Sequence, residues 1–145
     1  MSDLLDSRPT TNFWIVGGAA LVWNLIGLVF YYQHVTMTPE AMAGFTDAQK
    51  EFFATMPVWA TSAYAIAVNA GVLGSLFLLL RKSWAVPLFV LSLLGIVVQN
   101  FNAFLLANGL DVWGSSGIAL PAIVIVIAVA LLIYSRGAKD KGWLD

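Results

Sequence analysis

Residues 58–107 read VWATSAYAIAVNAGVLGSLFLLL, then RKSW, then AVPLFVLSLLGIVVQNFNAFLLA, so two long apolar runs are separated by four residues. Arg81 and Lys82, in that interruption, are the only adjacent pair of basic residues in the chain. The interruption is too short to form anything but a tight turn at a membrane surface. The segment therefore predicts a hairpin of two antiparallel transmembrane helices, and this hairpin sets the topology of the rest of the chain.

Composition extends this interpretation to the whole chain. Hydrophobic residues occupy 60% of the 145 positions and charged residues only 10%, whereas about a quarter of the residues in a soluble protein are charged. The charged residues leave four uncharged intervals, 9–39, 52–80, 83–110 and 112–135. Each interval can hold the roughly 20 apolar residues that cross a bilayer core. We therefore expect an all-α integral membrane protein, a single domain of residues 1–145, with spans at about 12–34, 58–80, 84–107 and 116–134.

Short connections between successive spans favour antiparallel neighbours, so an up-down-up-down four-helix bundle is the simplest architecture. Only the loop at 35–57 is sizeable, and its apolar residues suit a short amphipathic helix lying on the membrane. All basic residues except Lys50 fall on one side of this arrangement: Arg8, Arg81, Lys82, Arg136, Lys139 and Lys141. The positive-inside rule assigns that side to the cytoplasm. Both termini are then cytoplasmic, and the short helix is extracytoplasmic.

Small residues recur at spacings of three and four along the first two spans. Such stripes let helix backbones approach closely in lipid. The residues expected to pack helices in this way are Gly17, Ala20, Gly27, Ala63, Ala67, Gly71 and Gly74. They favour helix–helix association as the way in which the protein acts.

Polar residues inside the spans gather toward the outer half. Amides and phenols can orient a neutral polar ligand between bundle helices, and the same groups can equally form hydrogen bonds from helix to helix. The candidate ligand-binding residues are Asn24, Tyr64, Asn69, Gln99 and Asn102. As a binding site they would form a pocket between the first three spans, with Asn24 and Asn69 at its floor and the 35–57 loop above it.

Several classes of function are disfavoured by what the sequence lacks. There is no Cys and a single His, His34, so no set of ligands for a metal or haem is present and we expect no metal and no cofactor. No ionisable residue lies in the middle of a span, which argues against an ion-coupled carrier. No catalytic motif is found, so an enzyme is not expected. A net charge of −1 without basic runs argues against nucleic-acid binding.

Part of the chain resembles a known group of proteins. The segments AIAV (65–68), GVLGS (71–75) and LLRKSWAVPLF (79–89), with MPVW (56–59) and LSL (91–93), resemble small four-helix proteins of the bacterial inner membrane. The resemblance covers about the central third of the chain. It implies a four-helix fold in a bacterial cytoplasmic membrane. Some members of the group carry the label "sugar transporter", but the resemblance implies no particular binding or catalytic residue.

These observations favour a non-enzymatic membrane protein that acts through helix–helix association, as an accessory subunit of a membrane complex or as a homo-oligomer. Its expected partners are the lipid bilayer and other membrane subunits or further copies of itself. The alternative is a carrier or binding protein for a small neutral or amphipathic molecule, a lipid or a pigment included. For a lipid or pigment, the aromatic residues that suit the role are Trp14, Trp23, Phe101 and Phe104.

Overall fold

A computed structural model describes residues 9–107 and 109–145, and within them the chain is helical without strands. Its long helices are α2 (Thr11–Val35), α4 (Val58–Leu79), α5 (Ala85–Phe101) and α7 (Ala119–Asp140). A π-helix, η1 (Asn102–Leu106), prolongs α5, and a 3₁₀ turn, η2 (Ser115–Ile118), precedes α7. By length and composition, four helical segments of the described residues can cross a membrane. The expectation of an all-α chain with four long apolar helices is therefore confirmed.

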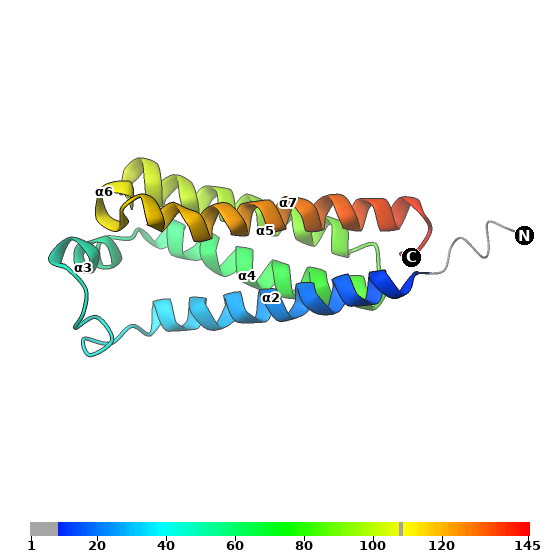
Figure 1. Cartoon of the computed structure of the whole chain (residues 1–145), viewed down its shortest axis with the longest axis horizontal. Coiled ribbons are helices and arrows are strands. Elements are labelled where there is room, and N and C mark those ends of the chain that lie inside the picture. The colour runs from blue at the N-terminus through cyan, green and yellow to red at the C-terminus, as the bar shows by residue number, and fades with distance from the viewer. Residues whose placement is uncertain (1–8, 108) are drawn as a thin grey trace, which may run out of the picture.

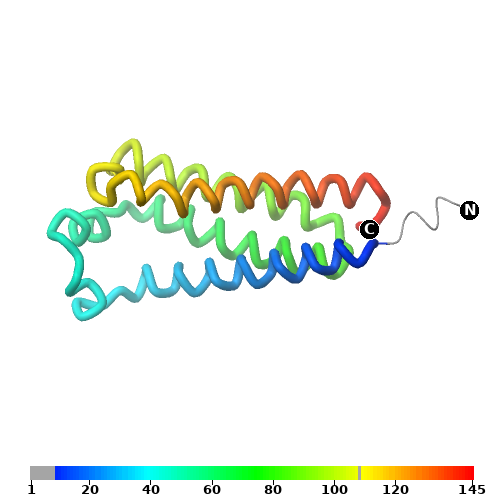
Figure 2. The backbone as a smooth tube through the Cα atoms, in the orientation of Figure 1, coloured from blue at the N-terminus to red at the C-terminus, as the bar shows by residue number. Residues whose placement is uncertain are grey.

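Successive long helices run in opposite directions along the long axis of the molecule (Figure 1). The short helices α3 (Asp47–Ala54) and α6 (Gly109–Trp113) lie together at one end, which we call the α3 end. The turn between α4 and α5 and the C-terminal residues lie at the opposite end (Figure 2). Across the bundle, α2 packs on α4, α4 packs most extensively on α5, and α5 packs on α7. In this packing order α2 and α7 are the outer helices.

Glycines allow the closest approaches between these helices. A Cβ on Gly17 would lie 2.6 Å from the side chain of Leu79, and one on Gly95 would lie 2.6 Å from the backbone oxygen of Ala63. At Gly95 the neighbour is backbone, so no larger residue fits there, whereas at Gly17 the Leu79 side chain would have to move. Among the small residues expected at helix contacts, Gly27 is half-buried and the others are buried: Gly17, Ala20, Ala63, Ala67, Gly71 and Gly74.

The C-terminal residues fold back onto the α4–α5 turn. The backbone N–H of Asp145 donates to the carbonyl of Arg81 (2.8 Å), and that of Ser83 donates to the carbonyl of Asp145 (3.1 Å). Trp143 is buried and packs edge-on against Phe13 at the start of α2, with 5.7 Å between ring centroids. These contacts tie the first and last parts of the described chain to the central hairpin.

The end of the fourth span differs from the sequence expectation. The span was expected to end near Tyr134 and to be followed by a polar tail, but α7 continues to Asp140. Leu131, Ser135 and Ala138 are buried at spacings of four and three, so one face of the helix keeps packing while its other face becomes charged. The first charged residue after the apolar run therefore does not end the helix.

Candidate functional site

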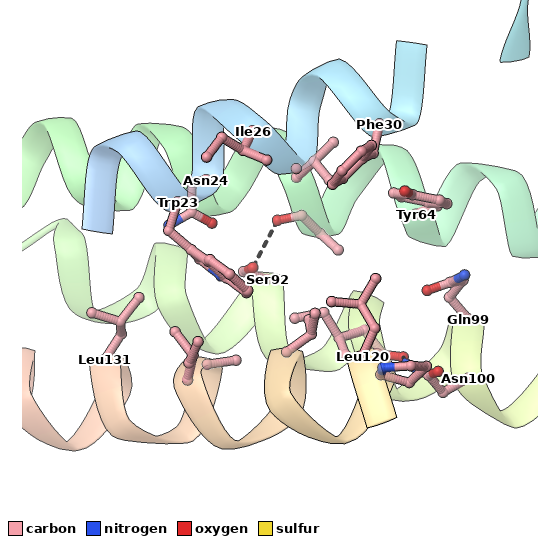
Figure 3. A pocket seen from close by; sticks show the side chains of 18 of the residues that line it. Trp23, Asn24, Ile26, Phe30, Tyr64, Ser92, Gln99, Asn100, Leu120 and Leu131 are labelled. Atoms are coloured by element: carbon pink, nitrogen blue, oxygen red, sulfur yellow. Dashed lines mark hydrogen bonds between the residues drawn. The ribbon is translucent and has the colours of Figure 1, made fainter. Parts of the chain in front are cut away.

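A cavity of about 270 Å³ lies among the four long helices, next to the contact between α4 and α5 (Figure 3). Because α2 and α7 are the outer members of the packing order, they form its two side walls. Trp23 and Phe30 line it from α2, and Leu120, Ile127 and Leu131 line it from α7. The lining is mainly apolar and includes no charged residue. Its polar side chains are Asn24, Tyr64, Ser92, Gln99 and Asn100.

Asn24 is held against α4 by a small polar network. Its Nδ2 donates to the carbonyl of Ala20 (2.8 Å) and to Oγ of Ser75 (3.1 Å), and Ser75 in turn donates to the carbonyl of Gly71 (2.9 Å). Oδ1 of Asn24 lies where a Cβ on Gly71 would be. The absence of a side chain at Gly71 thus creates the notch that receives the Asn24 amide.

Ser92 makes the matching contact from α5. It is 5% exposed, and its hydroxyl donates to the carbonyl of Ala67 on α4 at 2.7 Å. Its Oγ also lies within 3.3 Å of the Cβ position at Gly71. Asn24 and Ser92 therefore meet at Gly71, so polar groups from three helices converge at this level of the cavity.

A second polar level lies toward the α3 end. Figure 3 shows Tyr64 from α4 and Gln99 and Asn100 from α5 at the same end of the cavity. The Tyr64 ring contacts those of Tyr31 and His34, at centroid distances of 5.2 and 5.4 Å. Within the described residues, neither the Tyr64 hydroxyl nor the Gln99 amide takes part in a hydrogen bond. Both groups are half-buried and free to bind a ligand.

A shallower cavity of about 340 Å³ adjoins the first at this level and reaches the α3 end. Both are lined by Tyr64, Gln99, Asn100, Leu120 and Pro121. Aromatic rings of Phe52, Phe53 and Trp113 border the second cavity and contact one another, with centroids 5.8–5.9 Å apart. They tie α3 to α6 above the cavity, so this end of the bundle is covered by aromatic side chains.

The structure brings together only part of the site expected from the sequence. Asn24, Tyr64 and Gln99 line the cavity, as the pocket hypothesis requires. Asn69 does not, because it is exposed on another face of α4, where its Nδ2 donates to the carbonyl of Ala65 at 2.8 Å. Asn102 is 3% exposed but lines neither cavity, and its Nδ2 has no partner among the described residues.

Other residues of the cavity were not expected. Asn100 lies about 100° around the helix from Gln99, yet it also lines the cavity, because α7 forms a fourth wall. The sequence of α7 is almost purely aliphatic, a pattern typical of a helix that faces lipid, so it does not indicate that α7 lines a cavity. Ser92 shares a helix face with Gly95 and Gln99, and that spacing was its only signal.

The aromatic residues considered for a pigment do not form one surface. Trp14 contacts Phe13 at the start of α2, whereas Trp23 lines the first cavity. Phe104 lines the second cavity near the other end of the bundle, and Phe101 is about half exposed. Trp23 and Phe104 are thus placed beside polar groups described above, but in different cavities.

Comparison of the chain with models of protein families, with curated proteins and with solved structures finds no match. The cavity and its polar side chains are therefore the features that indicate a function.

Proposed function

We propose that the protein is a non-enzymatic membrane protein that binds or carries a small neutral amphipathic molecule in the cavity among α2, α4, α5 and α7. The observation that carries this proposal is a cavity of about 270 Å³ among the four long helices, with polar side chains at two levels of a mainly apolar lining. Ligand sites are typically apolar cavities in which a few polar groups fix the orientation of the ligand. A hydrocarbon part would contact Trp23 and Leu131, and a polar part would lie near Tyr64 and Gln99.

The charge of the ligand follows from the lining. Burying an ion away from water is costly unless a partner of opposite charge is present. The cavity lining contains neither acidic nor basic side chains. A neutral ligand is therefore favoured over an ion, an amino acid or a charged sugar.

We further propose that the α3 end faces the extracytoplasmic side of a bacterial cytoplasmic membrane, with both termini in the cytoplasm. Among the described basic residues, Lys50 lies in α3 and the others lie toward the opposite end: Arg81, Lys82, Arg136, Lys139 and Lys141. We call this opposite end the basic end. The positive-inside rule places it in the cytoplasm. Arg8, which was expected on the same side, lies outside the described residues.

Helix–helix association, as an accessory subunit or a homo-oligomer, is the second candidate. The small residues that favoured it are used inside the chain, since Gly71 receives Asn24 and Gly74 packs against Phe89. What still favours association is the open side between α2 and α7, the outer members of the packing order. Ligand binding ranks first because it accounts for the unpaired polar groups of Tyr64 and Gln99.

The test is to purify the protein in a gentle detergent and measure its mass, its visible spectrum and its bound small molecules in one sample. We expect a discrete neutral molecule to remain with the wild-type protein. Gln99→Leu should lose most of it, whereas Asn69→Leu, which changes an amide outside the cavity, should retain it. A ligand at a hundred times its dissociation constant should also stabilise the fold by about 2.7 kcal/mol.

The same sample separates the two candidates. Isolation with other subunits and without any bound molecule would contradict the binding proposal and support association. Equal ligand content in Gln99→Leu, Asn69→Leu and the wild type would show that the cavity is not the binding site.

A further inference from the structure

Three polar side chains of the cavity donate hydrogen bonds to backbone carbonyls. Nδ2 of Asn100 donates to the carbonyl of Ile96 (2.8 Å), as Nδ2 of Asn24 donates to that of Ala20. The hydroxyl of Ser92 donates to the carbonyl of Ala67. Because a carbonyl oxygen only accepts hydrogen bonds, the atom facing it must be the amide nitrogen, and this fixes which way each Asn side chain is turned.

The groups left over include both acceptors and donors. With their nitrogens engaged, Asn24 and Asn100 each retain an Oδ1 that accepts no hydrogen bond within the described residues. Ser92 Oγ likewise keeps acceptor capacity after its proton is used. Donors remain on Tyr64 and Gln99, on the second N–H of Asn100 and on the indole nitrogen of Trp23, and Tyr64 and Gln99 can also accept. A bound molecule that pairs with both kinds of group must therefore both donate and accept hydrogen bonds.

We propose that the ligand is a neutral amphiphile whose polar head carries hydroxyl groups, bound with its head at Tyr64, Gln99 and Asn100. This inference rests on the proposed function and deepens it. A hydroxyl group donates to Asn100 Oδ1 and accepts from Tyr64 or Gln99. It therefore pairs with both the acceptors and the donors at this level of the cavity. An ether or a ketone offers acceptors alone and leaves the Asn oxygens unsatisfied. An ammonium head would donate, but no carboxylate lines the cavity to balance its charge.

The position of the head follows from the two levels of polar groups. Seven residues of α5 separate Ser92 from Gln99, which corresponds to roughly 10 Å along the helix. Between these levels the cavity is bordered by apolar residues, among them Ile96 from α5 and Val124 from α7. The level of Tyr64, Gln99 and Asn100 also adjoins the second cavity, toward the α3 end. A head at the level of Tyr64 and Gln99 places the hydrocarbon chain among these apolar residues.

The experiment uses a photoreactive derivative of cetyl alcohol that keeps its hydroxyl, with the full chain in phosphatidylcholine nanodiscs. Unlabelled cetyl alcohol, cetyl methyl ether and cetylamine, which share one hydrocarbon chain, compete for photolabelling. We expect the alcohol to compete about tenfold better than the ether, because the ether cannot donate a hydrogen bond to the partly buried Asn100 Oδ1. It should exceed the amine as well, and the labelled peptides should derive from α5 and α7.

Variants add a matched control. Asn100→Leu removes the acceptor, so the alcohol should lose its advantage over the ether, which should itself compete as before. Asn69→Leu removes an amide with the same local hydrogen bond outside the cavity and should leave the tenfold preference intact. The comparison of three competitors on the wild-type protein does not depend on the folding of any variant.

Each contrary outcome has a distinct meaning. Equal competition by alcohol and ether, or strongest competition by the amine, would overturn the hydroxyl inference and leave the proposed binding function standing. If no saturable labelling by the photoreactive alcohol is found and neither ether nor amine binds, the proposed function fails together with it.

Discussion

Three asparagines of the spans make the same local hydrogen bond and have different surroundings. Asn24, Asn69 and Asn100 each donate Nδ2 to the carbonyl four residues earlier, at 2.8 Å. Such a bond satisfies the amide nitrogen within its own helix and leaves the oxygen to meet whatever lies beside the helix. For Asn24 that neighbour is Gly71, for Asn100 it is the cavity, and Asn69 is exposed on another face of α4. Residue type and depth alone do not distinguish these cases.

Gly71→Ala should destabilise the fold by about 1–3 kcal/mol, the usual cost of overpacking a closely packed site. The added methyl group would occupy the place of Asn24 Oδ1, so the amide would have to leave its notch. It would then lose its hydrogen bonds to Ala20 and Ser75. Thermal unfolding in detergent, followed by circular dichroism, measures the effect.

Gly18→Ala is the control, because a Cβ on Gly18 meets nothing within 4 Å. Alanine is also favoured over glycine in a helix by about 1 kcal/mol, so this variant should be neutral or slightly stabilised. If Gly71→Ala were as stable as Gly18→Ala, the packing of Asn24 against Gly71 would not contribute to the stability of the bundle.

At the scale of elements, the last helix and the segment after it hold the basic end of the bundle together. Trp143 packs against Phe13, and the Arg81 Nε donates to the carbonyl of Trp143 at 2.9 Å. Lys82 also pairs with Asp145 at 3.7 Å, but both side chains are exposed, and such pairs contribute little. Burial of aromatic surface is therefore expected to dominate the stability of this contact.

Trp143→Ala should cost about 3 kcal/mol, as truncations of buried aromatic residues do. Trp84→Ala, at the nearby α4–α5 turn, should cost less than about 0.5 kcal/mol because Trp84 is 69% exposed. Unfolding of both variants in the same detergent gives the comparison. Equal stability of the two would mean that the C-terminal segment is not docked on the bundle in solution.

For the molecule as a whole, the pattern of charges predicts the helices well. The uncharged intervals 9–39, 52–80 and 83–110 contain α2, α4, and α5 with η1. This works because a charge is costly in the bilayer core, so charges mark where a span ends. The pattern fails at the end of α7, where Arg136 and Lys139 lie on an exposed face of a helix that is still packed on its other face.

The candidate site was less predictable, for a geometric reason. Which residues face a cavity depends on how each helix is rotated and on which helices are neighbours, and hydrophobic patterning is weak when nearly every face is apolar. Small residues still locate the contacts of α2 with α4, since close packing requires them. Aliphatic residues such as Leu120 and Val124 carry no comparable mark, so the wall formed by α7 could be found only from the structure.

The orientation of the whole molecule in the membrane can be tested by labelling single introduced cysteines. The chain contains no Cys of its own, so no other position reacts. Ala48, in α3, and Lys139, near the end of α7, are both exposed, so each can be replaced by Cys without disturbing a packed contact. We expect a membrane-impermeant maleimide added to intact cells to label Ala48→Cys and not Lys139→Cys, because the basic end is placed in the cytoplasm by its charges. Permeabilised cells should show labelling of both, which controls for reactivity. Labelling of Lys139→Cys alone in intact cells would show that the molecule is inserted the other way round, and the second cavity would then open toward the cytoplasm.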